Sequence, residues 1–390
     1  MRLENLNCFL YTYTHSLILL YLNTMKIILD KNTLLEKLSI ASRFTSQRST
    51  TSQILQGVLI KGDKKEINFY SSNLNNYFHT KIKQEVEEEI NFLIEPQKTI
   101  EFLTLLQPGK ININIGEKKL TISQNKTTGS FPLLAPSDFP LPPKKGENEQ
   151  KLKTKDFFNS LSLVIFSSAK DEGRPVLTGV NFVANKELTL VTTDGFRLSL
   201  VKIEKQFDHP PLIIPAGFLE EVSKLAESEE EIGFLYIEEE KTVVFKIGQT
   251  EVYSRLIDGE FPPFEKVIPE KKETKITIDK NELLRAIKLI SIFAKDQSNI
   301  IVFDFKKEKL VIRPKTEIKE DATEIDIKIE GEEQTVAFNY RFLIDFLNHV
   351  PENKKNISIE VLRSDAPVVF RIEDKPNFLH IIMPVRIQED

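Results

Sequence analysis

One short segment occurs three times in this sequence, and a repeat of this kind restricts the chain to folds assembled from similar units. Residues 30–35 read Asp-Lys-Asn-Thr-Leu-Leu, and residues 279–284 read Asp-Lys-Asn-Glu-Leu-Leu. A weaker copy, Thr-Lys-Asp-Phe-Phe, occupies residues 154–158. Neighbouring copies lie about 125 residues apart. The spacing predicts three related domains in series.

Each copy begins with the same local pattern. A short apolar strand leads to a polar cap and then to a helix whose apolar residues recur at positions i, i+3, i+4 and i+7. The apolar residues are Leu34, Leu35, Leu38 and Ala41 in the first copy and Leu283, Leu284, Ile287 and Ile290 in the third. A second helix is predicted later in each copy, and Pro96, Pro215 and Asn339 lie near its three starts. Proline is tolerated and asparagine caps well at such positions.

The second helices and the strands between them define the fold class. The apolar residues of the second helices include Ile100, Leu103 and Leu106, then Leu219, Val222 and Leu225, and finally Leu343, Phe346 and Leu347. Most of the remaining sequence alternates like half-buried strands, as in residues 189–192 and 241–245. Two helices and many short strands per copy predict α+β domains with largely antiparallel sheets.

Segments rich in proline and charge mark the predicted domain boundaries. They lie near residues 142–147 and 269–273, and such composition is typical of linkers. We therefore expect an N-terminal extension at residues 1–24, a first domain at 25–146, a second at 147–271 and a third at 272–390.

The N-terminal extension differs in composition from the rest of the chain. Residues 5–24 carry no Asp, Glu, Lys or Arg, so their length raises the question of a membrane span. Asparagine, threonine, histidine and serine side chains interrupt the stretch, and each is costly in hydrocarbon. We therefore expect no membrane association and take Met25 as the working start of the fold.

Charge is distributed unevenly along the chain. The chain has 53 Lys and Arg residues against 58 Asp and Glu residues, a formal net charge of −5, which excludes a globally basic nucleic-acid binder. The windows around the three first helices, 30–48, 151–174 and 279–295, are each net basic. This separation of sign would let one surface attract phosphates while the remainder repels them.

Chemically reactive residues are few. The single cysteine, Cys8, excludes an intrachain disulfide and fits a reducing cytoplasm. The five histidines have no metal-ligand spacing, so no metal and no cofactor are expected. Glycine-rich phosphate loops and the common hydrolase motifs are missing from the sequence. Asp194-Gly195 is interpreted as a turn, and Arg197 as either a surface charge or a buried ion-pair partner. The residues favour a binding protein over an enzyme.

Several motifs in a fixed order resemble one known family. Residues 193–198, Thr-Asp-Gly-Phe-Arg-Leu, resemble the Thr-Asp-Gly-His-Arg-Leu signature of the beta subunits of bacterial DNA polymerase III, the sliding clamps. Residues 381–387, Ile-Ile-Met-Pro-Val-Arg-Ile, resemble the end of that family's chains. Segments 258–262 and 267–269 match between these two motifs, and segment 174–180 matches the family just before the signature. The resemblance runs from Met25 to Ile387 and includes the triple repeat.

The resemblance implies a head-to-tail homodimer that forms a closed ring around double-stranded DNA. Helices would line the hole and sheets would form the outer wall, so contacts would go to the DNA backbone without reading sequence. Arg48 and Arg174 match positions that approach DNA in relatives, and helix charge adds Lys37, Lys155 and Lys288. A solvated helix face remains the alternative for each of these residues.

The family also implies an apolar pocket between the second and third domains. The replicative polymerase, the clamp loader and repair proteins insert short linear peptides there. The matching residues are Leu177, Thr193, Gly195, Arg197, Leu198, Pro262, Val267, Asn339, Phe342, Met383, Pro384, Val385 and Arg386. Methionine suits a pocket that accepts several peptides because its side chain is flexible and polarisable.

Some positions depart from the family pattern. Phe196 replaces the commoner histidine, Lys266 replaces an arginine, and Ser298 stands where some relatives have an aromatic residue. Residues 388–390 extend past the usual chain end. The dimer interface implied by the resemblance pairs Ile292 and Phe293 of the third domain with the first domain near Phe131.

Two other functions remain open at this stage. One is an electrostatic DNA-binding or scaffold protein built on the same repeats, which would lose DNA steeply with salt. The other is an enzyme whose site involves Asp194. The leading hypothesis is a non-catalytic, cytoplasmic processivity clamp.

Overall fold

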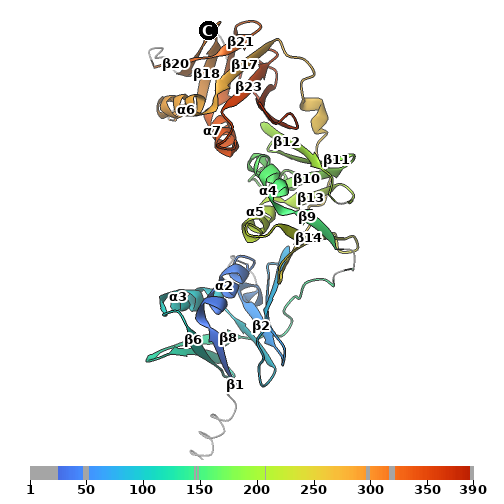
Figure 1. Ribbon diagram of the computed structural model, residues 1–390, viewed down its shortest axis with the longest axis vertical. Helices are drawn as coiled ribbons and strands as arrows, with labels where there is room; N and C mark the ends of the chain where they lie inside the picture. Colours follow the sequence, from blue (N-terminus) through green and yellow to red (C-terminus); the bar gives the residue numbers. More distant parts are fainter. Residues whose placement is uncertain are drawn as a thin grey trace, which may run out of the picture. The chain divides into compact units, whose positions relative to one another are not determined.

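The computed structural model describes residues 25–46, 52–144, 146, 149–206, 208–295, 299–315 and 321–386 (Figure 1). The chain divides into two compact units. Unit 1 contains the described residues up to Glu149 together with Gly233–Arg255, and unit 2 contains Gln150–Ile232 and the described residues from Leu256 onward. Strands from the predicted second domain thus belong to unit 1, and the predicted domain boundaries stay a prediction.

The three first helices are present, and each directly follows a strand. Strands β1 (Met25–Asp30), β9 (Gln150–Lys153) and β17 (Thr274–Asp279) lead into α2 (Lys31–Ser42), α4 (Thr154–Ser162) and α6 (Lys280–Ala294). The Asp30 side chain accepts a hydrogen bond from the Thr33 amide, and the Asp279 side chain accepts from the amides of Asn281 and Glu282. These are N-caps, which satisfy amides that a helix start leaves without partners.

The second helices are also confirmed, with one correction at an end. They are α3 (Pro96–Leu105), α5 (Ala216–Leu225) and α7 (Tyr340–His349). Pro96 opens α3, Pro215 is the N-cap of α5, and the Asn339 side chain caps α7 by accepting from the Arg341 amide. Leu106, predicted inside a helix, is the extended C-cap just beyond α3. Pro108 disfavours helical conformation in Gln107, the residue before it, so the helix has little room to continue past Leu106.

Antiparallel strands make up most of unit 1. Within it the strand order is β1-β6-β7-β8-β5-β2-β3-β4-β16-β15-β14. The bounds are β2 Val58–Gly62, β3 Ile67–Ser72, β4 Asn76–Ile82, β5 Ile90–Ile94, β6 Lys110–Ile115, β7 Lys119–Gln124, β8 Thr127–Leu134, β14 Glu231–Ile237, β15 Thr242–Ile247 and β16 Thr250–Arg255. Lys241, predicted at a strand start, has a φ of 44° and belongs to the preceding turn.

Unit 2 contains two antiparallel sheets. Their orders are β13-β10-β11-β12-β25-β24-β23-β17-β21 and β20-β19-β18-β22. The bounds are β10 Gly179–Ala184, β11 Glu187–Thr193, β12 Arg197–Glu204, β13 Leu212–Pro215, β18 Ile300–Phe305, β19 Lys309–Pro314, β20 Thr323–Asp326, β21 Lys328–Glu330, β22 Gln334–Asn339, β23 Asn356–Val361, β24 Val368–Ile372 and β25 Phe378–Ile382. Short 3₁₀ turns include η2 (Ile165–Ser167), η3 (Pro175–Thr178) and η4 (Phe264–Val267).

The same strand pairing joins successive repeats twice. In unit 1, β4 of the first repeat pairs with β16 of the second, and in unit 2, β12 of the second repeat pairs with β25 of the third. In the third repeat the strand equivalent to β4 and β12 is β20, and in the first repeat the strand equivalent to β16 and β25 is β8. These two strands take no part in either junction. Among the described residues β20 ends its sheet, and β8 pairs with β5 only at Leu133 and Leu134. Each chain therefore has two strand edges of the kind that join repeats elsewhere in it.

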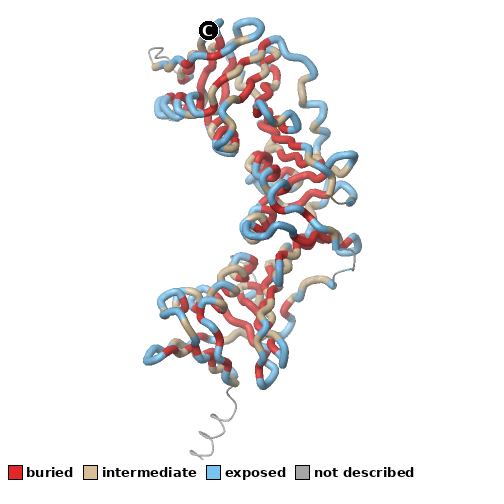
Figure 2. Tube along the Cα trace, in the orientation of Figure 1, coloured by how far each residue is buried: buried red, intermediate tan, exposed pale blue. Residues whose placement is uncertain are grey.

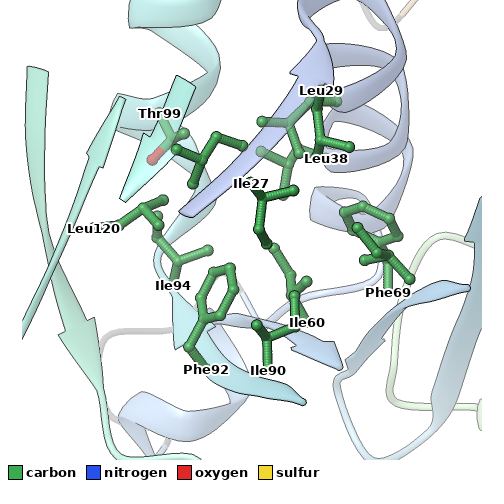
Figure 3. A pocket seen from close by; sticks show the side chains of 13 residues that line it. Ile27, Leu29, Leu38, Ile60, Phe69, Ile90, Phe92, Ile94, Thr99 and Leu120 are labelled. Carbon is green, nitrogen blue, oxygen red and sulfur yellow. The ribbon is translucent and has the colours of Figure 1, made fainter. Parts of the chain in front are cut away.

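Apolar side chains make up most of the buried residues in each unit, and Figure 2 shows where the buried segments lie along the backbone. The first repeat also encloses a small cavity of about 10 Å³ (Figure 3). Its walls are aliphatic and aromatic except for Thr99, whose hydroxyl has no hydrogen-bond partner among the described residues. The cavity is about the size of one water molecule and is a packing feature of the core. In the described part of the chain, no helix is long and apolar enough to cross a membrane.

Candidate peptide-binding site

A tight hairpin between β11 and β12 forms the centre of the site. The Asp194 side chain accepts hydrogen bonds from the amides of Phe196 (2.9 Å) and Arg197 (3.0 Å). The Thr193 hydroxyl accepts from the Gly195 amide (3.1 Å). Gly195 has a φ of 92°, a conformation that favours glycine. The predicted Asp-Gly turn is confirmed.

The hairpin between β3 and β4 has the same hydrogen bonds. The Asn73 side chain accepts from the amides of Asn75 (3.1 Å) and Asn76 (2.8 Å), and the Ser72 hydroxyl accepts from the Leu74 amide (3.0 Å). Position by position, Asn75 corresponds to Phe196 and Asn76 to Arg197. The backbone of this hairpin therefore forms without an aromatic tip and without an arginine, so both side chains are available for another role.

Arg197 is a buried ion-pair partner, which decides between the two interpretations of this residue. Its side chain is only 7% exposed. The guanidinium Nε donates to Asp194 Oδ2 (3.0 Å), Nη1 donates to Asp345 Oδ2 (2.7 Å), and Nη2 donates to the Phe166 carbonyl (2.9 Å). All three guanidinium nitrogens are used, as burial of a permanent charge requires.

Aromatic rings surround the same guanidinium. Arg197 Cζ lies 4.8 Å from the centroid of Phe342 and 5.6 Å from that of Phe166, within range of cation–π attraction. The ring of Phe196 stacks on Phe342 with centroids 6.4 Å apart. Phe196 is nevertheless 60% exposed. The site thus presents an apolar aromatic surface, and its Phe342 ring packs on the buried guanidinium of Arg197.

A polar chain is buried beneath the site. The hydroxyls of Ser167 and Ser199 lie 2.7 Å apart, and Ser199 Oγ lies 2.8 Å from His380 Nδ1. Burial, together with the nearby charges of Arg197 and His349, holds the pKa of His380 well below its usual value. The imidazole therefore stays neutral at physiological pH.

Backbone hydrogen bonds fix the segment that follows β25, residues 383–385, to the hairpin and to β22. The Met383 amide donates to the Phe196 carbonyl and the Val385 amide to the Ala337 carbonyl, both at 2.8 Å. In the preceding repeat the Arg255 amide donates to Asn75 and the Ile257 amide to Ile213, both at 2.9 Å. The arrangement of hairpin and strand end is therefore part of the repeated fold, and the side chains on it distinguish the two copies.

Comparison with known proteins identifies the family. Residues 25–143 match the family description "DNA polymerase III beta subunit, N-terminal domain", residues 151–263 match its central domain, and residues 265–386 match its C-terminal domain. The chain belongs to the DNA polymerase III beta subunit family. Its three repeats are three clamp domains, which confirms the predicted α+β fold class.

Individual relatives agree over nearly the whole length. The beta sliding clamp of Chlamydia trachomatis serovar D is 26% identical over 381 residues, which cover 95% of this chain and 89% of that protein. The beta sliding clamp of Bacillus subtilis is 27% identical, with 93% of this chain and 100% of that protein covered. The crystal structure of the Thermotoga maritima beta subunit superimposes with a TM-score of 0.84 at 24% identity, covering 93% of this chain and 100% of that one.

The predicted peptide-site residues of this beta subunit all lie within unit 2. Contacts in the hairpin and on α7 bring together Thr193, Gly195, Arg197, Phe342 and Met383, and Asn339 caps the helix that carries Phe342. Val385 is bonded through its amide to Ala337 of β22. Leu177 and Leu198 are 4% and 3% exposed and belong to the core. Pro262 and Val267 are exposed on the linker, where the neighbouring Phe261, Phe264 and Ile268 pack on the cluster that contains Leu198. Pro384 is half-buried and Arg386 is exposed.

Sequence reasoning missed two residues of the site. Asp345 and Phe166 both hold the Arg197 guanidinium, but neither belongs to a motif. Asp345 is 148 residues from Arg197 along the chain. A single sequence gives no signal for such a pair, because nothing local relates a helix carboxylate to a distant hairpin.

The predicted DNA-contacting residues occupy different environments. Lys155 and Lys288 are exposed on the first helices of their repeats. Lys37 is mostly buried and pairs with Glu36 (2.9 Å). Arg174 is exposed, and its Nη2 donates to the Asp194 carbonyl (2.7 Å), next to the peptide site. Arg48 lies outside the described residues, as do Ser298 and residues 388–390.

The predicted dimer residues also differ in exposure. Ile292 and Phe293 on α6 are 67% and 49% exposed. Phe131 is 8% exposed and packs edge-on against Phe102 of α3, with centroids 5.5 Å apart. Nearby on α3, the apolar side chain of Leu105 is 84% exposed. These roles remain predictions. The described residues contain no group of side chains suited to hold a metal ion.

Proposed function

We propose that this beta subunit acts as the sliding clamp of a bacterial DNA polymerase III by closing, with a second copy, into a head-to-tail ring around duplex DNA. The observation that carries the proposal is the match of three consecutive clamp domains over residues 25–386. Sliding clamps are processivity factors without catalysis of their own. We place the activity in the cytoplasm, where bacterial replication takes place.

The open strand edges support the ring. Two junctions between repeats are made by pairing within one chain, and β20 and β8 are the strands that would make the third. Pairing β20 of one copy with β8 of another repeats the same junction between chains. The contact joins unlike surfaces, and such a heterologous interface closes into a ring when its rotation allows. Exposed apolar side chains on α6 and Leu105 on α3 would be buried there.

The ring would contact DNA through phosphates alone. Lys155 and Lys288 are exposed on helices that recur in each repeat, and Arg174 is exposed at the start of η3. Lysine side chains bind phosphate as point charges and carry no sequence information. Arg48 and Lys37 complete the proposed set, with Lys37 already paired to Glu36. Sequence-independent contacts of this kind permit sliding.

The aromatic surface around Phe196 and Phe342 would receive partner proteins. An exposed phenylalanine stacked on a second ring, beside the flexible Met383, suits apolar anchor residues of short linear peptides. The replicative polymerase, the clamp loader and repair proteins are the expected partners. The Leu177→Ala, Met383→Ala double variant is expected to lose peptide binding while the ring stays intact.

A topological experiment tests the ring. Labelled protein is loaded onto nicked circular DNA with a matching clamp loader and ATP, washed at moderate salt, and the circle is then cut. Retention on the circle and release on cutting are expected for a closed ring. Equal and salt-sensitive binding to circular and linear DNA would instead indicate an electrostatic DNA-binding protein and would refute the clamp mechanism.

A further inference from the structure

Asp345 joins the signature hairpin to helix α7 at the peptide site. It belongs to α7, whereas its partner Arg197 opens β12 directly after the hairpin. The contact between Asp345 Oδ2 and Arg197 Nη1 is 2.7 Å long. We propose that Asp345 is a positioning residue of the peptide site: it holds Arg197 over Phe342 and so fixes the aromatic surface that partners bind. This inference rests on the peptide-binding function proposed above.

The placement of Asp345 on the helix is the first argument. Asp345 lies three residues after Phe342, so both side chains project from one face of α7. Arg197 contacts both of them, through an ion pair with Asp345 and through its guanidinium face over the Phe342 ring. The buried Leu343, Phe346 and Leu347 hold α7 in its own repeat, and His349 stacks on Phe166 with centroids 4.4 Å apart. The two Arg197 contacts add a local restraint at Phe342 itself, between its ring and the hairpin.

The rest of the guanidinium is bound within the central repeat. Nε pairs with Asp194 and Nη2 donates to the Phe166 carbonyl, and both residues precede Arg197 in the same repeat. Among the residues that the structure describes, Asp345 therefore supplies the charged contact that links this guanidinium to the third repeat. Without it, Arg197 keeps a carboxylate partner, but the helix that carries Phe342 loses its charged anchor to the hairpin.

The effect should fall on binding more than on stability. The Asp345 side chain is 48% exposed, whereas that of Arg197 is 7% exposed. When the carboxylate is removed, water can reach Nη1 from the exposed side, while Asp194 and the Phe166 carbonyl keep the rest of the guanidinium paired, so the cost to folding should be small. The hairpin also does not need the arginine, because the β3–β4 hairpin makes the same backbone contacts with Asn76 in its place. Loss of the pair would leave the fold intact and let the ring of Phe342 move away from Phe196, with which it stacks.

Fluorescence anisotropy with a defined probe tests the proposal. The probe is a fluorescein-labelled hexapeptide that carries two leucines and a phenylalanine. For Asp345→Ala we expect roughly tenfold weaker binding at an unchanged unfolding temperature. Asp345→Glu should restore most of the affinity because it keeps the charge. The matched control is Asp374→Ala, since Asp374 also forms an exposed ion pair, with Lys354 at 3.2 Å.

A double-mutant cycle separates positioning from direct contact. If Asp345 acts through Arg197, then Asp345→Ala causes no further loss in an Arg197→Ala background. Wild-type affinity in Asp345→Ala, or an equal additional loss in the Arg197→Ala background, would overturn the inference. Failure of the wild-type protein to bind the probe would instead refute the proposed peptide site itself, so the two failures are distinguishable.

Discussion

The imidazole ring of His380 lies flat on the ring of Phe346, with centroids 4.8 Å apart and planes inclined by 4°. His380 is fully buried, and its Nδ1 is bonded to Ser199. Its Nε2 has no hydrogen-bond partner among the residues that the structure describes. Protonation of both ring nitrogens would place a second cation near Arg197 in a buried, aromatic environment, which burial strongly disfavours.

The position of His380 predicts an acid-sensitive stability. Burial lowers the pKa of His380 in the folded protein, whereas the unfolded chain titrates near pH 6.5. Below about pH 6.5 the unfolded state therefore binds one more proton, and stability falls as the pH falls, by at most about 1.4 kcal/mol per pH unit from this residue. Urea unfolding between pH 8 and pH 5 measures the slope. His380→Gln should lose less stability over this range than the wild type, and parallel profiles would refute the assignment.

The cavity of the first repeat predicts a stabilising substitution. Thr99→Val keeps the shape of the side chain and removes a buried hydroxyl that lacks a partner. We expect the free energy of unfolding to rise by about 1 kcal/mol, measured by urea denaturation. Thr104→Val on the same helix is the control, because the Thr104 hydroxyl is exposed and bonded to the Ile100 carbonyl. That change should stay within about 0.5 kcal/mol. A less stable Thr99→Val would show that a water molecule satisfies the hydroxyl.

The exposed face of α6 predicts how to open the ring. Ile292→Asp places a charge on a side chain that is 67% exposed in the single chain and that the ring would bury. We expect the dimer to weaken by about a hundredfold or more, seen by analytical ultracentrifugation as a shift from the mass of two chains to that of one. Leu141→Asp, at a similarly exposed apolar position (47%) on the first linker, should leave the dimer unchanged. A dimer that survives Ile292→Asp would place the interface elsewhere.

The stacked pair Phe196 and Phe342 predicts a moderate effect on peptide affinity. Phe196→Ala removes an aromatic contact worth about 0.5–1.5 kcal/mol, so peptide binding should weaken roughly two- to tenfold. The unfolding temperature should not change, because the ring is mostly exposed. Leu74→Ala is a matched control, since Leu74 lies at the tip of the equivalent hairpin in the first repeat. Peptide affinity that depends equally on both residues would contradict the assigned site.

Local features of the fold could be predicted from the sequence with good accuracy. The caps at Asp30, Asp279 and Asn339 involve only residues two or three positions away, so their chemistry is visible in a short window of sequence. The Asp-Gly turn is local for the same reason. The apolar spacing predicts a helix that includes Leu106, whereas α3 ends at Leu105, two residues before the Gln107-Pro108 pair that disfavours helix.

Contacts between distant segments could not be predicted in this way. The pairing of Arg197 with Asp345 joins a hairpin to a helix of the next repeat, and the choice between a surface arginine and a buried one depends on that contact. The family resemblance named the residues of the peptide surface but not what holds them in place. Solvent exposure could not be predicted from the sequence either. Phe131 and Ile292 are both apolar, yet of the two only Ile292 is exposed to solvent.

The two equivalent hairpins accept very different residues at their tips. One has Leu74 and Asn75 where the other has Gly195 and Phe196, and the hydrogen bonds that shape the loop are the same. Folding of the loop and recognition by the loop are therefore encoded in separate residues. A clamp built in this way can change its partner preference by single substitutions at the tip, without passing through a misfolded intermediate in its evolution.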